Sequence, residues 1–308
     1  MLNKVIMDKP LISIIIPVYN RSKTIQRAID SVLSQTLDNF DLIIVDDCST
    51  DNSMEIVDSY QDPRIRKFTL NKNSGAAAAR NEGIKNSFSE FISFLDSDDK
   101  FEPEFLEESL NVLKNTSSEI GFMWTGSRLI YSTSGKILEQ QWNPKRATTS
   151  HLTFLKDLKI GTGAGITVKK EVFENCGYFD DSLPAAEDTE FFLRITEKYD
   201  YAVSLKILIN IYRENSDRLS KNFVKIANAY NQFLPNHFAE IDQHPEIMVR
   251  YYYKMMWLNY HLKDKIKAKY YYDKIPKELR TSRIMAVKYL YELFPLTSAF
   301  YFHEKLAG

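Results

Sequence analysis

The stretch Phe91-Ile-Ser-Phe-Leu-Asp-Ser-Asp-Asp99 decides the fold class of this 308-residue chain, because an apolar run ends abruptly in three carboxylates. A short β-rich run followed by acids is typical of a strand whose carboxyl end reaches the ligand crevice of an open α/β sheet. Asp96, Asp98 and Asp99 repel one another and attract a divalent cation, and hard oxygen ligands favour Mg2+ or Mn2+ over zinc. An acidic turn, or the cap of the next helix, is the alternative that these residue types leave open.

Alternating strands and helices precede this stretch. Residues 11–18 form a nearly continuous β-branched run, which predicts a buried parallel strand ended by Pro17. Asn52 and Glu55 make a capping-box-like start to a helix. The remaining expected elements are strands at 40–45 and 64–70, a fourth strand in the apolar run that opens at Phe91, and helices at 25–33 and 76–86. This alternation predicts a Rossmann-like, doubly wound and mostly parallel α/β sheet within residues 1–99.

The strands of such a sheet end at a common edge. Asp47 follows the second strand and Arg80 lies in the Ala-rich helix before the fourth. Because the carboxyl ends of parallel strands lie together, we expect Asp47, Arg80 and residues 96–99 to converge. The Asp46-Asp47 pair also leaves open a phosphoryl-transfer or receiver-like domain, which would explain a carboxylate cluster and a metal but not Asp188.

The pattern changes after residue 99. Residues 100–220 mix helical and strand-like pieces, and Glu187 and Asp188 open an amphipathic helix whose macrodipole favours ionised carboxylates, with plain capping as the alternative. From Asn222 the chain becomes helical, aromatic and basic. We therefore expect a domain at 1–220, divided into a nucleotide-binding half at 1–99 and an acceptor half at 100–220, and a helical C-terminal region at 221–308.

Composition excludes several classes of protein. The chain has 40 basic and 41 acidic residues, so it has no overall attraction to nucleic acid, and its two cysteines give no disulfide framework. The first ten residues lack the apolar region of a signal peptide, and no run reaches the roughly 18 apolar residues of a spanning helix. A cytoplasmic protein is expected.

The C-terminal region differs in charge from the rest. It carries 13 basic and 8 acidic residues from Asn222 onward, a net charge of +5, against 27 basic and 33 acidic residues before it, a net charge of −6. Lys263, Lys265, Lys267 and Lys269 alternate with apolar or acidic residues beside Tyr270 to Tyr272, which suggests self-association or peripheral contact with the anionic inner face of a membrane. A merely solvated helix face is the default reading.

Six ordered motifs together resemble the family 2 glycosyltransferases. They are Ile15-Ile-Pro-Val-Tyr-Asn20, Ser31-Val-Leu-Ser-Gln-Thr36, Ile43-Ile-Val-Asp-Asp-Cys-Ser-Thr-Asp51, Gly75-Ala-Ala-Ala-Ala-Arg-Asn-Glu-Gly83, Phe94-Leu-Asp-Ser-Asp-Asp99 and Glu187-Asp188. The resemblance covers residues 10 to about 220. It implies a GT-A fold and transfer of a sugar from a nucleotide diphosphate sugar with inversion.

The resemblance assigns donor contacts residue by residue. It places Pro17 and Tyr19 against the nucleotide base, Asp47 on the base edge and Arg80 near the nucleotide. A carboxylate only accepts hydrogen bonds, so Asp47 suits the N–H edge of uracil, thymine or guanine and not cytosine, and a UDP-sugar is favoured.

The resemblance also implies a metal ligand and a base. Asp96 matches a position near the ribose and metal, and Asp98 matches the ligand of a Mn2+ or Mg2+ ion that bridges the diphosphate. A cation there stabilises the leaving group, so no general acid is needed. Asp188 matches the base that deprotonates the acceptor hydroxyl, and Glu187 beside it is structural or a contact to donor or acceptor.

One departure concerns the loop after the base helix. Many relatives carry a histidine where this chain has Asn215, so a histidine contribution to the metal is not expected. Arg213 and Arg218 remain possible contacts of this loop to the diphosphate.

The resulting functional prediction is a metal-dependent hexosyl- or N-acetylhexosaminyl-transferase. It would add one sugar to a glycan, lipid-linked or polysaccharide acceptor. The alternative is a catalytically silent module that binds a sugar nucleotide and scaffolds a glycan assembly complex through the C-terminal helices.

Overall fold

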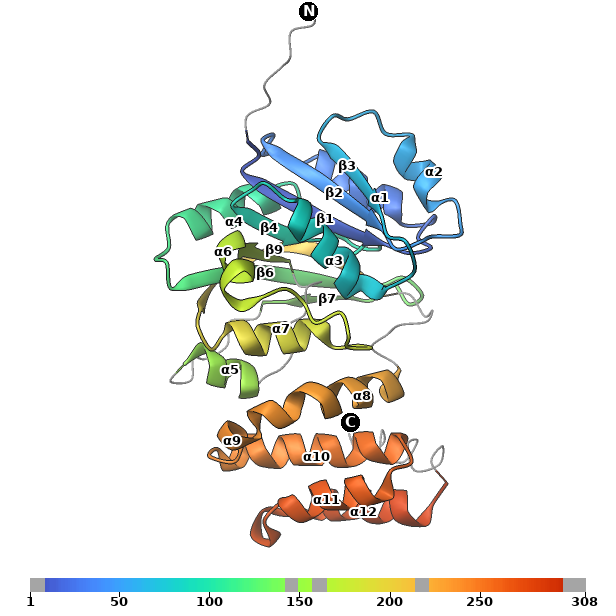
Figure 1. The fold of residues 1–308 in the computed structure, drawn as a ribbon, viewed down its shortest axis with the longest axis vertical. Helices are drawn as coiled ribbons and strands as arrows, with labels where there is room; N and C mark the ends of the chain where they lie inside the picture. Colours follow the sequence, from blue (N-terminus) through green and yellow to red (C-terminus); the bar gives the residue numbers. More distant parts are fainter. Residues whose placement is uncertain (1–8, 142–148, 157–164, 214–221, 296–308) are drawn as a thin grey trace, which may run out of the picture. The chain divides into compact units, whose positions relative to one another are not determined.

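The computed structural model describes residues 9–141, 149–156, 165–213 and 222–295. The chain divides into two compact units, residues 1–181 with 188–216 and residues 182–187 with 217–308 (Figure 1). The two units are described separately below. In the described residues, no helix is both long and apolar enough to cross a membrane.

The first unit begins with four parallel strands in the order β3-β2-β1-β4. The elements are β1 (Ile12–Val18), α1 (Ile25–Leu33), β2 (Phe40–Asp46), α2 (Ser53–Asp58), β3 (Ile65–Thr69), α3 (Gly75–Asn86) and β4 (Phe91–Phe94). Each of the first three strands is followed by a crossover helix, as a parallel sheet requires. The expected α/β sheet of residues 1–99 is therefore confirmed.

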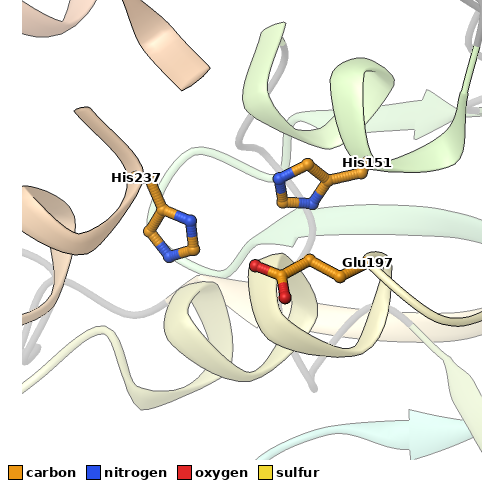
Figure 2. A group of neighbouring side chains, drawn as sticks. All are labelled: His151, Glu197 and His237. Atoms are coloured by element: carbon orange, nitrogen blue, oxygen red, sulfur yellow. The ribbon is translucent and has the colours of Figure 1, made fainter. Parts of the chain in front are cut away.

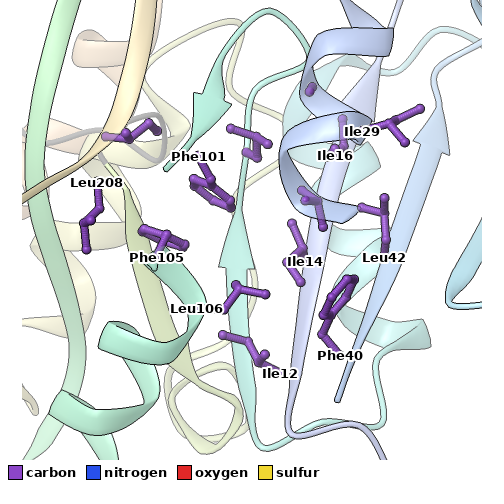
Figure 3. Close-up of a cluster of buried hydrophobic side chains, with 14 of the residues drawn as sticks. Ile12, Ile14, Ile16, Ile29, Phe40, Leu42, Phe101, Phe105, Leu106 and Leu208 are labelled. Atoms are coloured by element: carbon purple, nitrogen blue, oxygen red, sulfur yellow. The ribbon is translucent and has the colours of Figure 1, made fainter. Parts of the chain in front are cut away.

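Alternation along β1 explains how both faces of this sheet are covered. Ile12, Ile14 and Ile16 belong to one hydrophobic cluster with α1 side chains such as Ile29 (Figure 3). Ile15 points to the opposite face, where α3 packs so closely that a Cβ on Gly83 would lie 2.6 Å from Ile15 Cγ2. Both faces are buried, so the strand reads as a continuous apolar run rather than an alternating one.

The remaining strands make the whole sheet mixed. They follow β4 in the order β8-β6-β9-β5, with β7 paired to β6. Strands β6 and β9 pair in parallel, and the pairs β4–β8, β6–β8, β5–β9 and β6–β7 are antiparallel. The elements are β5 (Lys100–Phe101), α4 (Phe105–Lys114), β6 (Ile120–Tyr131), β7 (Ile137–Gln140), α5 (Ser150–Lys156), β8 (Ile166–Lys169), α6 (Lys170–Cys176), α7 (Glu187–Ile195) and β9 (Asp200–Arg213).

Aromatic packing fixes α7 against this sheet. The Phe191 ring lies 4.4 Å from that of Phe179, and the Phe179 ring lies 5.5 Å from that of Phe94 on β4. Phe192 lies 5.4 Å from Phe122 on β6. These buried rings hold the first turn of α7, and each fully buried aromatic contributes roughly 1.5–3 kcal/mol through its apolar area.

The second unit is helical. Its elements are α8 (Phe223–Phe233), η3 (Leu234–His237), α9 (Phe238–Ile241), α10 (Pro245–His261), α11 (Lys265–Lys274), η4 (Lys277–Leu279) and α12 (Ser282–Leu293). The central helix α10 packs against α8, α11 and α12, with Tyr260 stacked on Tyr291 at 5.1 Å. The expected helical C-terminal region is confirmed.

Two local expectations are wrong. Pro17 does not end β1, which runs to Val18. Proline is tolerated there because β1 pairs with β4 only as far as Ile15, so the missing N–H has no strand beside it. Asn52 does not cap α2 through its side chain; Asp51 instead accepts the Ser53 N–H at 3.0 Å.

Candidate functional site

The carboxyl ends of β1, β2 and β4 lie at one edge of the sheet. Val18 and Asp46 are paired at the ends of β1 and β2. Asn20 after β1 donates its N–H to Ser49 Oγ and accepts the Thr50 N–H at 2.8 Å, which ties the first two loops together. Parallel pairing thus brings these loops to one edge, which is where sheets of this kind bind ligands.

Asp47 is engaged by the backbone of α3. Its carboxylate accepts the Ser74 N–H at 2.6 Å and the Gly75 N–H at 2.8 Å, and the residue is only 3% exposed. These N–H groups begin a helix and have no partner within it, and the helix macrodipole adds to the attraction for a carboxylate. Each carboxylate oxygen keeps a second lone pair. The predicted base contact of Asp47 would use one of these.

Arg80 and Asp96 meet, as expected for residues that converge at this edge. Arg80 Nη2 donates to Asp96 Oδ1 at 2.9 Å, and the arginine side chain is only 6% exposed. Its neighbour Asn81 donates to the Phe179 carbonyl at 2.9 Å and accepts the Phe179 N–H at 3.0 Å. Helix α3 therefore links the acidic turn to the segment that leads to α7.

The turn at residues 96–99 holds its three carboxylates differently. Its backbone is closed by the Asp99 N–H on the Asp96 carbonyl at 3.0 Å. Asp96 pairs with Arg80, and Asp99 accepts the Tyr212 N–H at 2.9 Å. Among the residues that the structure describes, no other residue donates a hydrogen bond to the Asp98 carboxylate and none forms an ion pair with it.

The electrostatics of this turn favour a cation. Burial raises the pKa of Asp98, the Asp96 charge raises it further, and Arg21 and Arg27 act in the opposite direction. Burial, followed by Asp96 and Asp98, raises the pKa of Asp99 well above its usual value, against the Tyr212 hydrogen bond. A nearby cation stabilises the charged form of carboxylates that lie close together in a buried turn. The Asp98 carboxylate therefore fits a Mg2+ or Mn2+ ion with ligand oxygens completing its coordination.

Asp188 lies in the first turn of α7, as expected. Its Oδ1 accepts the Thr189 N–H at 2.7 Å, and Glu187 is the first residue of the helix. The preceding Ala186 has φ +59°, a left-handed conformation that is uncommon for residues other than glycine. A strained residue immediately before a helix is frequent at functional sites.

The other predicted residues have simpler surroundings. Pro17 lies within β1, and Tyr19 follows that strand with 43% of its surface exposed. Arg213 ends β9, and its charge is near enough to lower the pKa of Asp99. Arg218 and Asn215 lie outside the described residues.

Two side chains of this edge were missed by sequence reasoning. Asn81 lies inside the quoted Gly75–Gly83 motif, and its burial between a helix and a distant loop gave no sequence signal. Arg27 on α1 donates Nη2 to the Asp98 carbonyl, and its guanidinium lies 3.6 Å from the Tyr212 ring centroid. The helical periodicity of α1 places Arg27 on the polar face, so no sequence pattern indicated a contact with the acidic turn.

His151 on α5 and Glu197 after α7 lie close together in the first unit (Figure 2), with ligand atoms within 4.8 Å of each other. Thr196 donates to the Phe192 carbonyl at 2.8 Å, so the 3.1 Å contact to His151 Nδ1 requires that this nitrogen donate. Two residues are fewer than the three or four protein ligands of a zinc site. His237, drawn with them, belongs to η3 of the second unit.

Sequence relatives share the region that carries this edge. The model of glycosyl transferase family 2 matches residues 13–177. An uncharacterized glycosyltransferase of Rickettsia prowazekii is 30% identical over 220 residues, 69% of this chain and 68% of that protein. One of Rickettsia typhi is 34% identical over 205 residues, 64% of this chain and 63% of that protein. TuaG of Bacillus subtilis, named for teichuronic acid biosynthesis, is 41% identical over 124 residues, 40% of this chain and 48% of that protein.

Solved structures share the fold. TarS of S. aureus in complex with UDP-GlcNAc has a TM-score of 0.60 at 19% identity and covers 85% of this chain and 90% of its own. A mannosyltransferase of Pyrobaculum calidifontis with GDP-Man and Mn2+ has a TM-score of 0.54 at 14% identity, over 96% of this chain and 87% of its own. These likenesses show the GT-A fold, and the matching family model identifies the chain as an enzyme that belongs to glycosyl transferase family 2.

Proposed function

We propose that this chain is an inverting, metal-dependent glycosyltransferase that moves one sugar from a nucleotide diphosphate sugar to an acceptor hydroxyl. The observation that carries the proposal is the Asp98 carboxylate, which has no bond to another described residue while Asp47, Asp96 and Asp99 are each held by the protein. A group that the fold leaves unpaired at a ligand edge is the natural candidate to bind the cation.

Each residue has one proposed role. Asp98 would hold Mn2+ or Mg2+, which neutralises the negative charge that develops on the departing diphosphate. Asp188 would accept the proton of the acceptor hydroxyl, on the face of the sugar opposite the leaving group. Arg80, already paired with Asp96, would keep that carboxylate in place beside the donor.

A UDP-sugar is the favoured donor. Asp47 offers only lone pairs, which match the imide N–H of uracil. The TarS structure contains UDP-GlcNAc, and the Pyrobaculum enzyme contains GDP-Man, so a guanine nucleotide is the next candidate. Uracil and guanine each present a ring N–H at the base-pairing edge, whereas cytosine presents the acceptor N3 there, which would repel a carboxylate.

The acceptor would be a polysaccharide, a glycan or a lipid-linked chain. The similarity to TuaG, which is named for teichuronic acid biosynthesis, supports a polysaccharide. Such an acceptor would be reached at a membrane surface, and the second unit supports peripheral contact. Residues 263–292 carry nine basic and four acidic residues. Helices α11 and α12, which we call the α11–α12 hairpin, expose five large apolar side chains: Ile266, Tyr270, Met285, Tyr289 and Leu293.

Calorimetry tests the proposal directly. We expect UDP to bind wild-type protein only with Mn2+, more tightly than dTDP or GDP, and CDP not to bind. Asp98→Asn should abolish the Mn2+-dependent binding of UDP. Asp58→Asn, which changes an exposed aspartate paired with Lys67, should leave that binding intact. Metal-dependent binding without sugar transfer would favour the silent scaffold, and metal-independent binding in both proteins would contradict the assigned role of Asp98.

A further inference from the structure

The acidic turn at residues 96–99 is held from three directions. Arg80 of α3 holds the Asp96 carboxylate, and the Tyr212 N–H of β9 holds the Asp99 carboxylate. The third contact is made by Arg27 of α1, which donates Nη2 to the backbone carbonyl of Asp98. This contact therefore reaches the predicted metal ligand through its backbone and leaves its carboxylate unoccupied.

Arg27 is unusual for a residue that only supports packing. Its guanidinium carbon lies 3.6 Å from the centroid of the Tyr212 ring, and its Nε is buried with no hydrogen-bond partner among the described residues. A buried N–H that makes no bond costs about 1–3 kcal/mol. Lysine has no Nε–H to leave unpaired, and a methionine would fill similar space, so packing alone does not explain an arginine here.

A positive charge at this position has a clear physical use. Three carboxylates within four residues repel one another, and in the interior this repulsion is stronger than in water. Arg80 is paired with Asp96, and the charges of Arg21 and Arg213 also reach the turn. Arg27 adds a cation that is fixed by the Tyr212 ring and donates to a carbonyl, so it does not compete with a metal for the Asp98 oxygens.

We propose that Arg27 is a positioning residue that preorganises Asp98 for its cation, an inference that rests on the proposed function. By fixing the Asp98 carbonyl, Arg27 fixes the turn backbone from which the carboxylate extends. A ligand held by surrounding contacts binds its metal without having to be ordered first. Without Arg27 the repulsion between the carboxylates would open the turn. Cation binding would then be weaker, because the cation would have to close the turn as it binds.

The experiment compares two arginines. Arg27→Met removes the carbonyl bond and the cation, and Arg64→Met is its matched control, because Arg64 also lies over an aromatic ring, that of Phe40 at 4.4 Å, and also bonds a neighbour, Asp62. Arg64 precedes β3 and therefore lies at the opposite end of the strands. We measure amide hydrogen exchange at residues 96–99 without metal, and Mn2+-dependent UDP binding by calorimetry.

Arg27→Met should speed exchange of the Asp99 amide, which closes the turn, about tenfold and should raise the Kd for UDP with Mn2+ about tenfold. Arg64→Met should change neither, even where it lowers Tm. Arg27→Lys keeps the cation and should restore part of both effects, and it replaces Arg27→Met if that variant does not fold. Wild-type exchange and wild-type Mn2+ dependence in the Arg27 variants would overturn the inference. If wild type itself shows no metal-dependent binding, the proposed function fails, and the exchange rates still decide the role of Arg27.

Discussion

The acidic edge of the first unit and the α11–α12 hairpin of the second differ in the chemical type of the side chains that the described structure leaves unpaired or exposed. At the edge, hydrogen bonds satisfy Asp47 and Asp99, an ion pair satisfies Asp96, and the charge of Asp98 remains. On the hairpin, the remaining groups are exposed apolar side chains, with Leu293 74% exposed, among basic residues. We therefore propose the edge as the site of chemistry and the hairpin as the membrane contact, and substitutions in the two regions should affect different measurements.

The largest difference between the regions should appear with Asp188→Asn. An amide cannot accept the acceptor proton, so kcat should fall about 10³-fold. UDP binding with Mn2+ should stay within about twofold, because the base contacts the acceptor and not the nucleotide. Steady-state transfer assays with UDP-sugars measure the first quantity and calorimetry the second. Full activity in this variant would remove Asp188 from the mechanism.

A smaller effect should separate two aspartates that serve helix N-termini, one in each region. Asp47 is buried and accepts two N–H groups of α3, whereas Asp264 accepts the Lys267 N–H of α11 at the surface. Asp47→Asn leaves one N–H facing an amide donor and should lower the free energy of unfolding by about 2 kcal/mol. Asp264→Asn keeps a good N-cap and should cost less than about 0.5 kcal/mol. Urea unfolding of both variants measures the contrast, and equal losses would contradict the burial argument.

Substitutions on the α11–α12 hairpin should weaken membrane binding without changing stability or activity. Tyr289→Ser with Leu293→Ser removes two exposed apolar groups, and we expect roughly tenfold weaker binding to vesicles that contain phosphatidylserine. The free energy of unfolding and kcat on a short soluble acceptor should not change, because neither side chain is buried. Flotation measures the binding, and neutral vesicles are the control. Equal flotation of wild type and variant would show that this surface does not contact lipid, and a concentration-dependent mass by light scattering would assign it to self-association.

The smallest expected effect is a pH-dependent contribution of Asp51, in the first unit, to the free energy of unfolding. Burial alone would raise the pKa of Asp51, but hydrogen bonds from Ser53 and from the Ser22 backbone lower it to about 2. A depressed pKa contributes stability that is fully present above the unfolded value of about 4 and is lost as the pH falls toward 2. Asp51→Asn should therefore lower the free energy of unfolding at pH 6 by about 1 kcal/mol or less, and the difference should shrink below pH 4. Urea unfolding across this pH range tests the sign.

The parallel half of the sheet was readable because its signals are local. The apolar run of β1, the helical spacing of α1 and the acids after β2 and β4 each lie within one short segment. The strand β9 was not recognised, although it pairs along most of its length with β6. Its residues do not alternate cleanly, because its pairing with β6 is interrupted by three register shifts.

Sequence alone determined the family, the alternation of strands and helices in the first half and the residue types at its edge, since motif and period depend only on neighbours along the chain. Tertiary structure decided which of those residues are already engaged. It placed Asp47 on the α3 N-terminus, paired Arg80 with Asp96 and brought Arg27 under Asp98. These contacts join residues 16 to 71 positions apart, and such partners are chosen by how helices pack on the sheet rather than by any local pattern.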